Sequence, residues 1–335
     1  MKKRVLVTGG AGFIGHHLVE SLLRETDYDV VSLDRLDVSG DLSRIESVLL
    51  KNPEWKSRFK IVWHDLKAPL NFLVRKRIGK VQHILHLAAG SHVDRSIAYP
   101  LEFVMDNVVG TANLLEFARN YLSDSLEFFL YFSTDEVFGP APEGVFYKEN
   151  DRYDSGNPYS ATKAGGEELC VAYANTYGMP IMITHTMNVF GHRQHPEKFI
   201  PLVIDKVRRG EEVTIHANSE CTQAGKRHYV HASDVAGAVL FLMKAGKVRE
   251  KYNIVGEREV DNLELAHMIA KAMEKTLKYK MVDFHSARPG HDLRYALCGE
   301  KMKNLGWQPT KNFHERIEEV VEWTLENPEW LGAEK

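Results

Sequence analysis

The chain has 335 residues, of which 44% are hydrophobic and 27% are charged, as in ordinary globular proteins. Its formal charge of −3 excludes a basic field for nucleic acid, and its longest strongly apolar run, residues 235–243, is too short to span a membrane. The three cysteines are far apart and lack metal-like spacing, so we expect free thiols, no metal site and a cytoplasmic protein.

The first half of the chain alternates between predicted strands and helices. A β-branched run over residues 4–8 ends at glycines and predicts a buried parallel strand, and helical spacing follows over residues 13–24. The later strands that we expect cover residues 30–33, 61–63, 83–87 and 128–132. This alternation predicts an α/β fold, a Rossmann-type doubly wound parallel sheet, whose functional groups gather at the carboxyl ends of the strands.

The pattern changes near residue 190. Proline, glycine and charged residues become frequent, the strands shorten, and helices are expected over residues 234–243, 262–273 and 312–326. We therefore expect a Rossmann domain over residues 1–190 and a smaller α+β substrate-binding lobe over residues 191–335. The boundary is approximate, and the chain is expected to cross between the two lobes.

A glycine-rich turn joins the first expected strand to the first helix. Glycines at this turn let the backbone approach a pyrophosphate, and the free N–H groups of the helix start attract phosphates. A tight turn without a ligand is the alternative, but the next strand ends at Asp34, as the dinucleotide fingerprint requires. The residues expected to hold a dinucleotide here are Gly9, Gly12, Phe13, Ile14, Gly15 and Asp34.

Asp34 favours NAD over NADP, because a carboxylate accepts hydrogen bonds from ribose hydroxyls and repels an added phosphate. Arg35 weakens this inference, since an arginine can hold that phosphate, but we expect Arg35 to be a solvated surface charge. Asp65 and Leu66 follow the third strand and would suit the adenine, although Asp65 is nearly as well explained as an ordinary loop carboxylate.

Tyr159 and Lys163 form a second candidate site. They are four residues apart, so on a helix that begins at Pro158 they share one face. A cationic amine beside a phenol lowers the pKa of the phenol, which lets the tyrosine act as a general base. Alone, such a pair is better explained as a surface pair.

Thr134, Asp135 and Glu136 follow the fifth expected strand. The threonine hydroxyl could bridge a substrate and Tyr159. Burial and mutual repulsion would separate the pKa values of the two carboxyl groups, leaving one an acid and the other a base. A solvated turn is the alternative, but the pair lies at the expected active edge of the sheet. With Tyr159 and Lys163, these are the parts of an oxidation coupled to an elimination, so we expect an enzyme.

These features, together with residues 87–89 (Leu-Ala-Ala), resemble the extended short-chain dehydrogenase/reductase superfamily. The Thr-Asp-Glu triplet is similar to that of the nucleotide-hexose 4,6-dehydratases, above all those acting on dTDP-glucose. The resemblance covers almost the whole chain, and its further matches are residues 91–96 (SHVDRS), 107–111 (NVVGT), 196–201 (PEKFIP) and 288–292 (RPGHD).

The resemblance implies an NAD-dependent hydro-lyase that converts dTDP-glucose or UDP-glucose into the 4-keto-6-deoxy sugar. Tyr159 takes the proton of the carbon 4 hydroxyl while a hydride leaves for NAD, Thr134 bonds that oxygen, and Lys163 also holds the nicotinamide ribose. Glu136 then removes the carbon 5 proton, Asp135 protonates the carbon 6 hydroxyl as it leaves as water, and the hydride returns to carbon 6.

The resemblance also implies cofactor contacts from Ala88 and Ala89, and a homodimer formed through helices over residues 100–121 and 158–177. A core position for these helices is equally compatible with the sequence. The substrate contacts that it implies are Ser91, His92, Asn188, Lys198, Arg227, Arg288 and His291.

Three features depart from the family pattern, one of which is that residues 187–191 (MNVFG) keep one asparagine where relatives often have two. Gly90 stands where relatives carry glutamate, and the loop over residues 214–227 lacks their tyrosine-glycine pair, so thymidine versus uridine stays open. A nucleotide-sugar 4-epimerase or decarboxylase is one alternative, against which Asp135 argues. A non-catalytic NAD-binding regulator is another, against which the presence of both Tyr159 and Lys163 argues.

Overall fold

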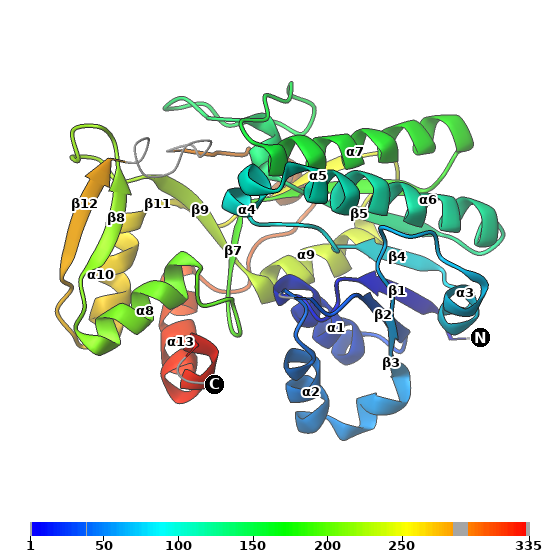
Figure 1. The fold of residues 1–335 in the computed structure, drawn as a ribbon, viewed down its shortest axis with the longest axis horizontal. Helices are drawn as coiled ribbons and strands as arrows, with labels where there is room; N and C mark the ends of the chain where they lie inside the picture. The colour runs from blue at the N-terminus through cyan, green and yellow to red at the C-terminus, as the bar shows by residue number, and fades with distance from the viewer. Residues whose placement is uncertain (1, 38, 284–293, 333–335) are drawn as a thin grey trace.

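The computed structural model describes residues 2–37, 39–283 and 294–332, which form a larger and a smaller lobe (Figure 1). The larger lobe is built on a seven-stranded parallel sheet of order β10-β6-β5-β4-β1-β2-β3. The predicted Rossmann-type fold is therefore confirmed. The strands of this sheet are β1 (Arg4–Thr8), β2 (Asp29–Asp34), β3 (Phe59–Trp63), β4 (His83–His86), β5 (Phe128–Thr134), β6 (Ile181–Thr186) and β10 (Lys251–Ile254).

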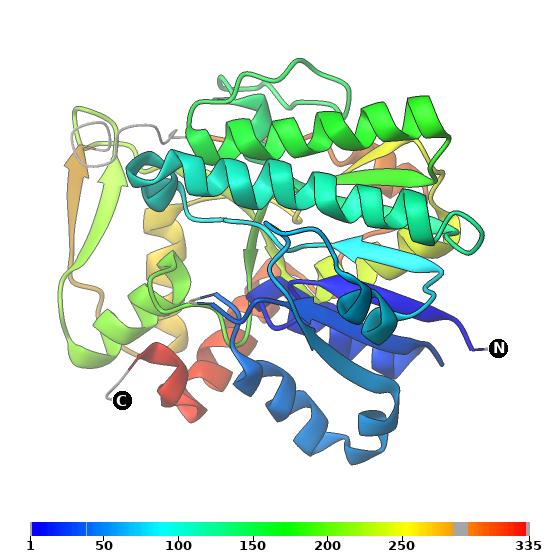
Figure 2. The ribbon, with the colours of Figure 1, turned by 45° about the vertical axis from the view of Figure 1, so that its right-hand side comes forward.

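Helices cover both faces of this sheet (Figure 2). The side chains of β1 show why both faces need a cover: Val5 and Val7 enter one core, and Leu6 between them enters the other. Helices α1 (Phe13–Glu25) and α9 (Ala232–Ala245) line the first core. The second core lies under α3 (Phe72–Ile78), α6 (Gly110–Tyr121) and α7 (Pro158–Tyr177).

The helix expected over residues 100–121 is interrupted. It consists of α5 (Pro100–Phe103), a π-helical segment η2 (Val104–Val109) and α6. Such π segments often occur at functional sites, because the wider turn redirects side chains. Here Asn107 is buried and bonds both backbone groups of Gly90.

The smaller lobe has its own apolar core, which includes Phe190, Ile200, Leu265 and Phe313. Its two sheets are β11-β9-β7 and β12-β8, made of β7 (Asn188–Phe190), β8 (Val213–Ala217), β9 (Lys226–His231), β11 (Glu259–Asp261) and β12 (Tyr279–Asp283). Its helices are α8 (Phe199–Arg209), α10 (Asn262–Ala272) and α13 (Phe313–Glu326).

The chain crosses between the lobes more than once. After β7 it builds part of the smaller lobe, and it then returns to the large sheet as α9 and β10 before leaving again. The remaining short elements are α2 (Leu42–Lys51), η1 (Pro53–Arg58), α4 (Val93–Ala98), η3 (Asp135–Phe138), α12 (Glu300–Asn304) and η4 (Pro328–Leu331). Among the helices of the described residues, none has the length and apolar character needed to cross a membrane.

Candidate active site

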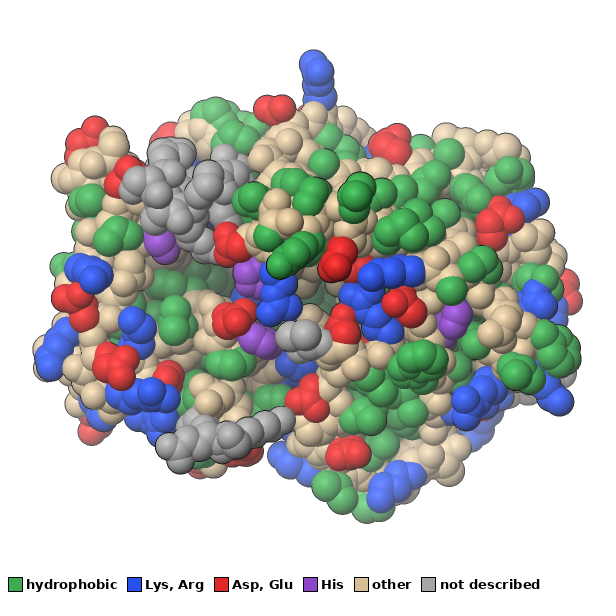
Figure 3. All heavy atoms as spheres, in the orientation of Figure 1, with side chains coloured by type: hydrophobic (Ala, Val, Ile, Leu, Met, Phe, Trp, Pro, Cys, Tyr) green, Lys and Arg blue, Asp and Glu red, His purple; other side chains and the backbone are tan. Residues whose placement is uncertain are grey.

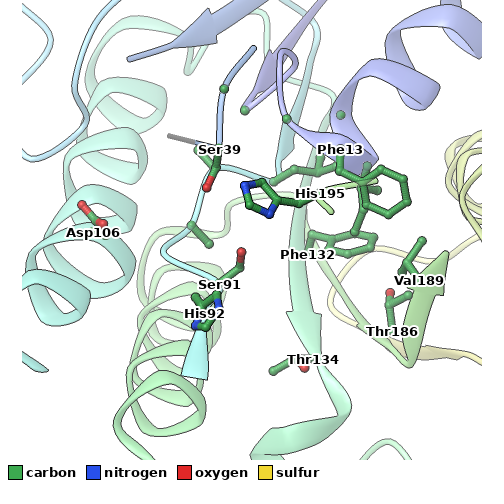
Figure 4. Close-up of a pocket in the computed structure, with 18 of the residues that line it drawn as sticks. Phe13, Ser39, Ser91, His92, Asp106, Phe132, Thr134, Thr186, Val189 and His195 are labelled. Carbon is green, nitrogen blue, oxygen red and sulfur yellow. The ribbon is translucent and has the colours of Figure 1, made fainter. Parts of the chain in front are cut away.

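A cavity of about 410 Å³ lies at the carboxyl ends of the large sheet and is closed on one side by the smaller lobe. Figure 4 shows Phe13 from the start of α1, Thr134 from the end of β5 and Val189 from β7 around it. Charged side chains gather around the hollow at the centre of the face in Figure 3. The residues predicted for cofactor binding and catalysis all line this cavity: Gly9, Gly12, Phe13, Ile14, Gly15, Asp34, Asp65, Leu66, Ala88, Ala89, Thr134, Asp135, Glu136, Tyr159 and Lys163.

The glycine turn has the geometry that a dinucleotide needs. Gly9 has a φ of +72°, and a Cβ there would lie 2.9 Å from the backbone nitrogen of Ala88. A Cβ at Gly15 would lie 2.0 Å from the carbonyl oxygen of Gly9. Among the described residues no side chain caps α1, and the residues of its first turn, Phe13, Ile14 and Gly15, line the cavity. The free N–H groups of a helix start attract an anion. The turn therefore fits a pyrophosphate.

Asp34 ends β2, beside this turn. Its Oδ2 accepts a hydrogen bond from the N–H of Ala11 at 3.1 Å, and its Oδ1 accepts one from the N–H of Leu36 at 2.9 Å. Burial raises the pKa of Asp34, while these backbone bonds oppose the rise. Because each carboxylate oxygen has two lone pairs, both oxygens of Asp34 can still accept a hydrogen bond from a ribose hydroxyl. The site therefore fits the ribose of a dinucleotide.

Arg35 is not the solvated surface charge that the sequence predicted. Its guanidinium makes two bonds to the carboxylate of Asp106, at 2.5 and 2.9 Å, and its Nε donates to Asp37 at 2.6 Å. Arg35 lines the cavity. The sequence could not show this arrangement, because Asp106 lies 71 residues away on η2.

Tyr159 and Lys163 lie on α7, as predicted, and both are buried. Lys163 donates from Nζ to the carbonyl of Phe132 at 2.6 Å, and burial lowers its pKa to about 8. The prediction of a lowered phenol pKa is wrong. Burial and the charge of Glu136 raise the pKa of Tyr159, although a hydrogen bond with Thr134 works the other way.

The acidic doublet lies on the short helix η3, where the backbone folds back because Thr134 accepts a bond from the N–H of Glu136. Asp135 is buried, and burial together with the charge of Glu136 raises its pKa to about 7. Glu136 accepts a hydrogen bond from Asn157 at 3.2 Å. The two carboxyl groups therefore have different environments, as an acid and a base require.

The predicted substrate residues are only partly brought together. Ser91, His92, Asn188 and Lys198 line the cavity. Arg227 is not among the lining residues of the cavity. Its positive charge partly opposes the rise in the pKa of Asp135. Its guanidinium lies over the ring of Tyr295, 4.8 Å from the ring centre. The predicted contacts Arg288 and His291 lie outside the described residues.

Several lining residues were missed from the sequence. Thr186 ends β6, a strand that the run Ile181–Thr186 could have indicated, and its buried hydroxyl has no partner within the described residues. His92 Nε2 lies 3.6 Å from Glu197 Oε2, a contact that joins the two lobes. No sequence signal links those two residues. The other missed side chains at the cavity include Lys67, Arg95, Asp106, Gln194 and His195.

This sheet, glycine turn and Tyr-Lys pair define an extended short-chain dehydrogenase/reductase. The chain belongs to the GDP-mannose 4,6 dehydratase family, whose sequence model matches residues 6–320.

Several characterised relatives match almost the whole chain. It is 34% identical to dTDP-glucose 4,6-dehydratase of Salmonella typhimurium, over 99% of the chain and 95% of that protein. It is 38% identical to the low-salt glycan biosynthesis protein Agl12 of Haloferax volcanii, over 97% of the chain and 99% of that protein. A trifunctional UDP-glucose 4,6-dehydratase of Arabidopsis thaliana is 35% identical, but the match covers only 48% of that longer protein.

Solved structures agree with this assignment. DesIV of Streptomyces venezuelae, a dTDP-glucose 4,6-dehydratase crystallised with NAD, superposes with a TM-score of 0.86 at 33% identity, covering 98% of each chain. UDP-glucose 4-epimerase of Thermus thermophilus, also with NAD, gives a TM-score of 0.85 at 29% identity, covering 99% of this chain and 100% of the other. The overall fold alone therefore does not separate a dehydratase from an epimerase.

Proposed function

We propose that the protein is an NAD-dependent nucleotide-sugar 4,6-dehydratase that converts dTDP-glucose or UDP-glucose into its 4-keto-6-deoxy form. The observation that carries the proposal is the position of Asp135 and Glu136 in the same cavity as Tyr159 and Lys163. An epimerase needs the tyrosine and the lysine, whereas only an elimination of water needs a separate acid and base.

The residues of the cavity divide this work by their chemistry. Tyr159 takes the proton of the carbon 4 hydroxyl in its ionised form, which burial disfavours and the hydrogen bond with Thr134 favours. Thr134 also holds the carbon 4 oxygen. Glu136 removes the proton of carbon 5, which is acidic beside the new ketone. Asp135 protonates the carbon 6 hydroxyl, which then leaves as water.

The cofactor is held by the glycine turn, by Asp34 and by residues 88–89, which all line one end of the cavity. When bound, NAD accepts a hydride from the sugar and later returns it. The buried Lys163, one turn from Tyr159 on α7, is mostly protonated at neutral pH, because Cys170 and Glu167 oppose the effect of burial and its pKa stays at about 8. Ser91, His92, Asn188 and Lys198 are the proposed contacts of the sugar nucleotide, with Arg227, Arg288 and His291 carried over from the family.

The proposal is tested by incubating the purified protein with dTDP-glucose, UDP-glucose and GDP-mannose. Mass spectrometry should show the loss of one water from the accepted sugar nucleotide, and alkali should develop the colour of a 4-keto-6-deoxy product. An epimerase would change the sugar without changing its mass. Tyr159→Phe should abolish turnover, whereas Tyr279→Phe, an exposed tyrosine on β12, should leave it unchanged.

Asp135→Asn separates the steps. It should slow the loss of water about a hundredfold or more, because the leaving hydroxyl loses its acid, while oxidation of carbon 4 continues and reduced cofactor accumulates. If both steps fell equally, the assignment of the acid would be wrong.

We also infer that the protein is a cytoplasmic homodimer. The face formed by α4–α6 and α7 carries apolar side chains, seen as green spheres in the upper part of Figure 3. The exposed apolar residues on these elements are Ile97, Tyr99, Leu101, Val104, Met105, Tyr121 and Tyr177. Such a face marks an interaction surface. Light scattering should show a dimer that Leu101→Glu dissociates, whereas Leu50→Glu, an exposed leucine on α2, should have no effect.

A further inference from the structure

A group of charged residues surrounds one end of the cavity, beside Asp34. The cations are Arg35, which follows β2, and Lys67, which follows β3. Asp106 on η2 binds both of them: its Oδ1 lies 2.5 Å from Arg35 Nη1 and 3.4 Å from Lys67 Nζ. The carboxylates of Asp37 and Asp65 lie 2.6 and 3.8 Å from the same guanidinium.

This arrangement occupies the groups that would otherwise bind a phosphate. An arginine binds a phosphate through a pair of parallel N–H groups. In Arg35 that pair is directed at Asp106, and the remaining face at Nε is directed at Asp37. With Asp34 included, four carboxylates surround two cations, so the region repels a dianion.

The bond between Arg35 and Asp106 is partly buried, with the side chain of Arg35 29% exposed. The side chain of Asp106 is only 9% exposed, which strengthens its attraction for both cations. Gly90 provides the space: a Cβ at that position would lie 3.2 Å from Asp106 Oδ2 and 3.1 Å from the ring of Phe103. A longer side chain at residue 90 would have to displace either Phe103 or the acid.

We propose that Asp106 determines the choice of NAD over NADP by holding Arg35 away from the 2′-phosphate position. This inference rests on the proposed use of a nicotinamide dinucleotide. Asp34 alone repels the extra phosphate, but a free arginine next to it would offset that repulsion. Asp106, directed by the π-helical turn and accommodated by Gly90, removes this possibility.

The test measures binding and not turnover. Protein is dialysed against an equal mixture of NAD and NADP, and the bound nucleotides are released by denaturation and quantified by chromatography. Asp106→Asn keeps the shape of the side chain and removes its charge, so the ratio of bound NADP to bound NAD should rise about tenfold. Asp37→Asn, which frees only Nε, should raise it less. Asp124→Asn, the same change at an exposed position after α6, should leave it unchanged.

The double variant Arg35→Ala/Asp106→Asn shows whether the arginine is responsible. The double variant should lose most of the increase in the ratio of bound NADP to bound NAD, because it lacks the guanidinium that Asp106→Asn alone would free. An unchanged ratio in Asp106→Asn, with a cooperative thermal transition that shows the variant to be folded, would overturn the proposal. A double variant that kept the whole gain would also overturn it. Wild-type protein that bound neither nucleotide would instead refute the proposed cofactor, so the two failures are distinguishable.

Discussion

The hydroxyl of Thr134 donates a hydrogen bond to Asp135, with 3.1 Å between Oγ1 and Oδ1. The other carboxylate oxygen, Oδ2, is buried and has no hydrogen-bond partner within the part of the chain that is described. One oxygen is thus fixed, and the second is available to carry a proton. Since burial and Glu136 raise the pKa of Asp135 to about 7, this group is a carboxylic acid for part of the time at neutral pH.

Turnover should therefore decrease on the alkaline side. The acid form of Asp135 is required to protonate the leaving hydroxyl, and it is lost as the pH rises through about 7. The rate at saturating substrate should fall by up to tenfold per pH unit above that value. It is measured as product formed between about pH 6 and about pH 9, with the KM followed separately. A constant rate across this range would contradict the assignment.

Asp135→Asn should make the protein more stable above neutral pH. The folded state raises the pKa of Asp135 above its value in the unfolded chain, so folding binds more protons and stability falls as the pH rises from about 4 to about 7. Above that range the full cost of the buried charge is present. The neutral amide avoids this cost, and the gain should be on the order of 2 kcal/mol.

Urea unfolding at pH values below and above this range measures the change. Thr134 can still donate to the side-chain oxygen of the amide, but the amide nitrogen then replaces the buried Oδ2, and its unpaired N–H groups reduce the gain by a similar amount at every pH. The increase in the free energy of unfolding caused by Asp135→Asn should be smaller at acidic pH, because wild-type Asp135 is protonated there. An equal gain at both pH values would show that the charge is not its cause.

Glu167 should be essential for stability although it is not exposed to the cavity. It is fully buried on α7 and lies 2.9 Å from Lys251 Nζ and 3.2 Å from His185 Nε2. Although burial opposes its charge, His185 and Lys251 hold the pKa of Glu167 below its ordinary value. Glu167→Gln leaves the ammonium of Lys251 without its counter-charge and should cost about 3 kcal/mol.

Glu168→Gln is the matched control, since it changes the next, exposed residue of the same helix and should cost less than about 0.5 kcal/mol. Both values come from urea unfolding at neutral pH. If the two variants were equally stable, the buried ion pair would contribute nothing. Because a carboxyl with a lowered pKa stabilises the protein only while ionised, the difference should decrease as the pH falls toward the acid range.

Two glycines should respond in opposite ways to alanine. At Gly15 a Cβ would lie 2.0 Å from the carbonyl oxygen of Gly9, so Gly15→Ala must displace the dinucleotide turn. It should lower the thermal midpoint and weaken NAD binding at least about tenfold. Gly237 lies inside α9, and beyond its own stretch of helix no heavy atom of the described residues lies within 4 Å of a Cβ there. Gly237→Ala should therefore stabilise the protein by about 0.5–1 kcal/mol. A harmless Gly15→Ala would show that the turn adapts to a side chain.

Local patterns were enough for the strands of the large sheet up to β5, for α7 and for the glycine turn, because buried parallel strands and turn glycines leave short-range signals. Strand β6 was overlooked although its apolar run is clear in the sequence. The π-helical turn η2 was not predictable, since a helical pattern does not reveal one extra residue per turn. The lowered phenol pKa was also a wrong prediction, because it considered the partner of Tyr159 in sequence and not its burial.

The order of the residues was sufficient to predict five strands of the large sheet, the dinucleotide turn and the residue types of the reaction. Each of these depends on neighbours within a few positions, or on motifs in which the chemistry and the spacing occur together. The three-dimensional fold was needed to show which charges far apart in the chain come together, namely Arg35 with Asp106 and Glu167 with Lys251. Electrostatic energies depend on the distance between charges in space and on the exclusion of water. Neither can be calculated from the order of the residues alone.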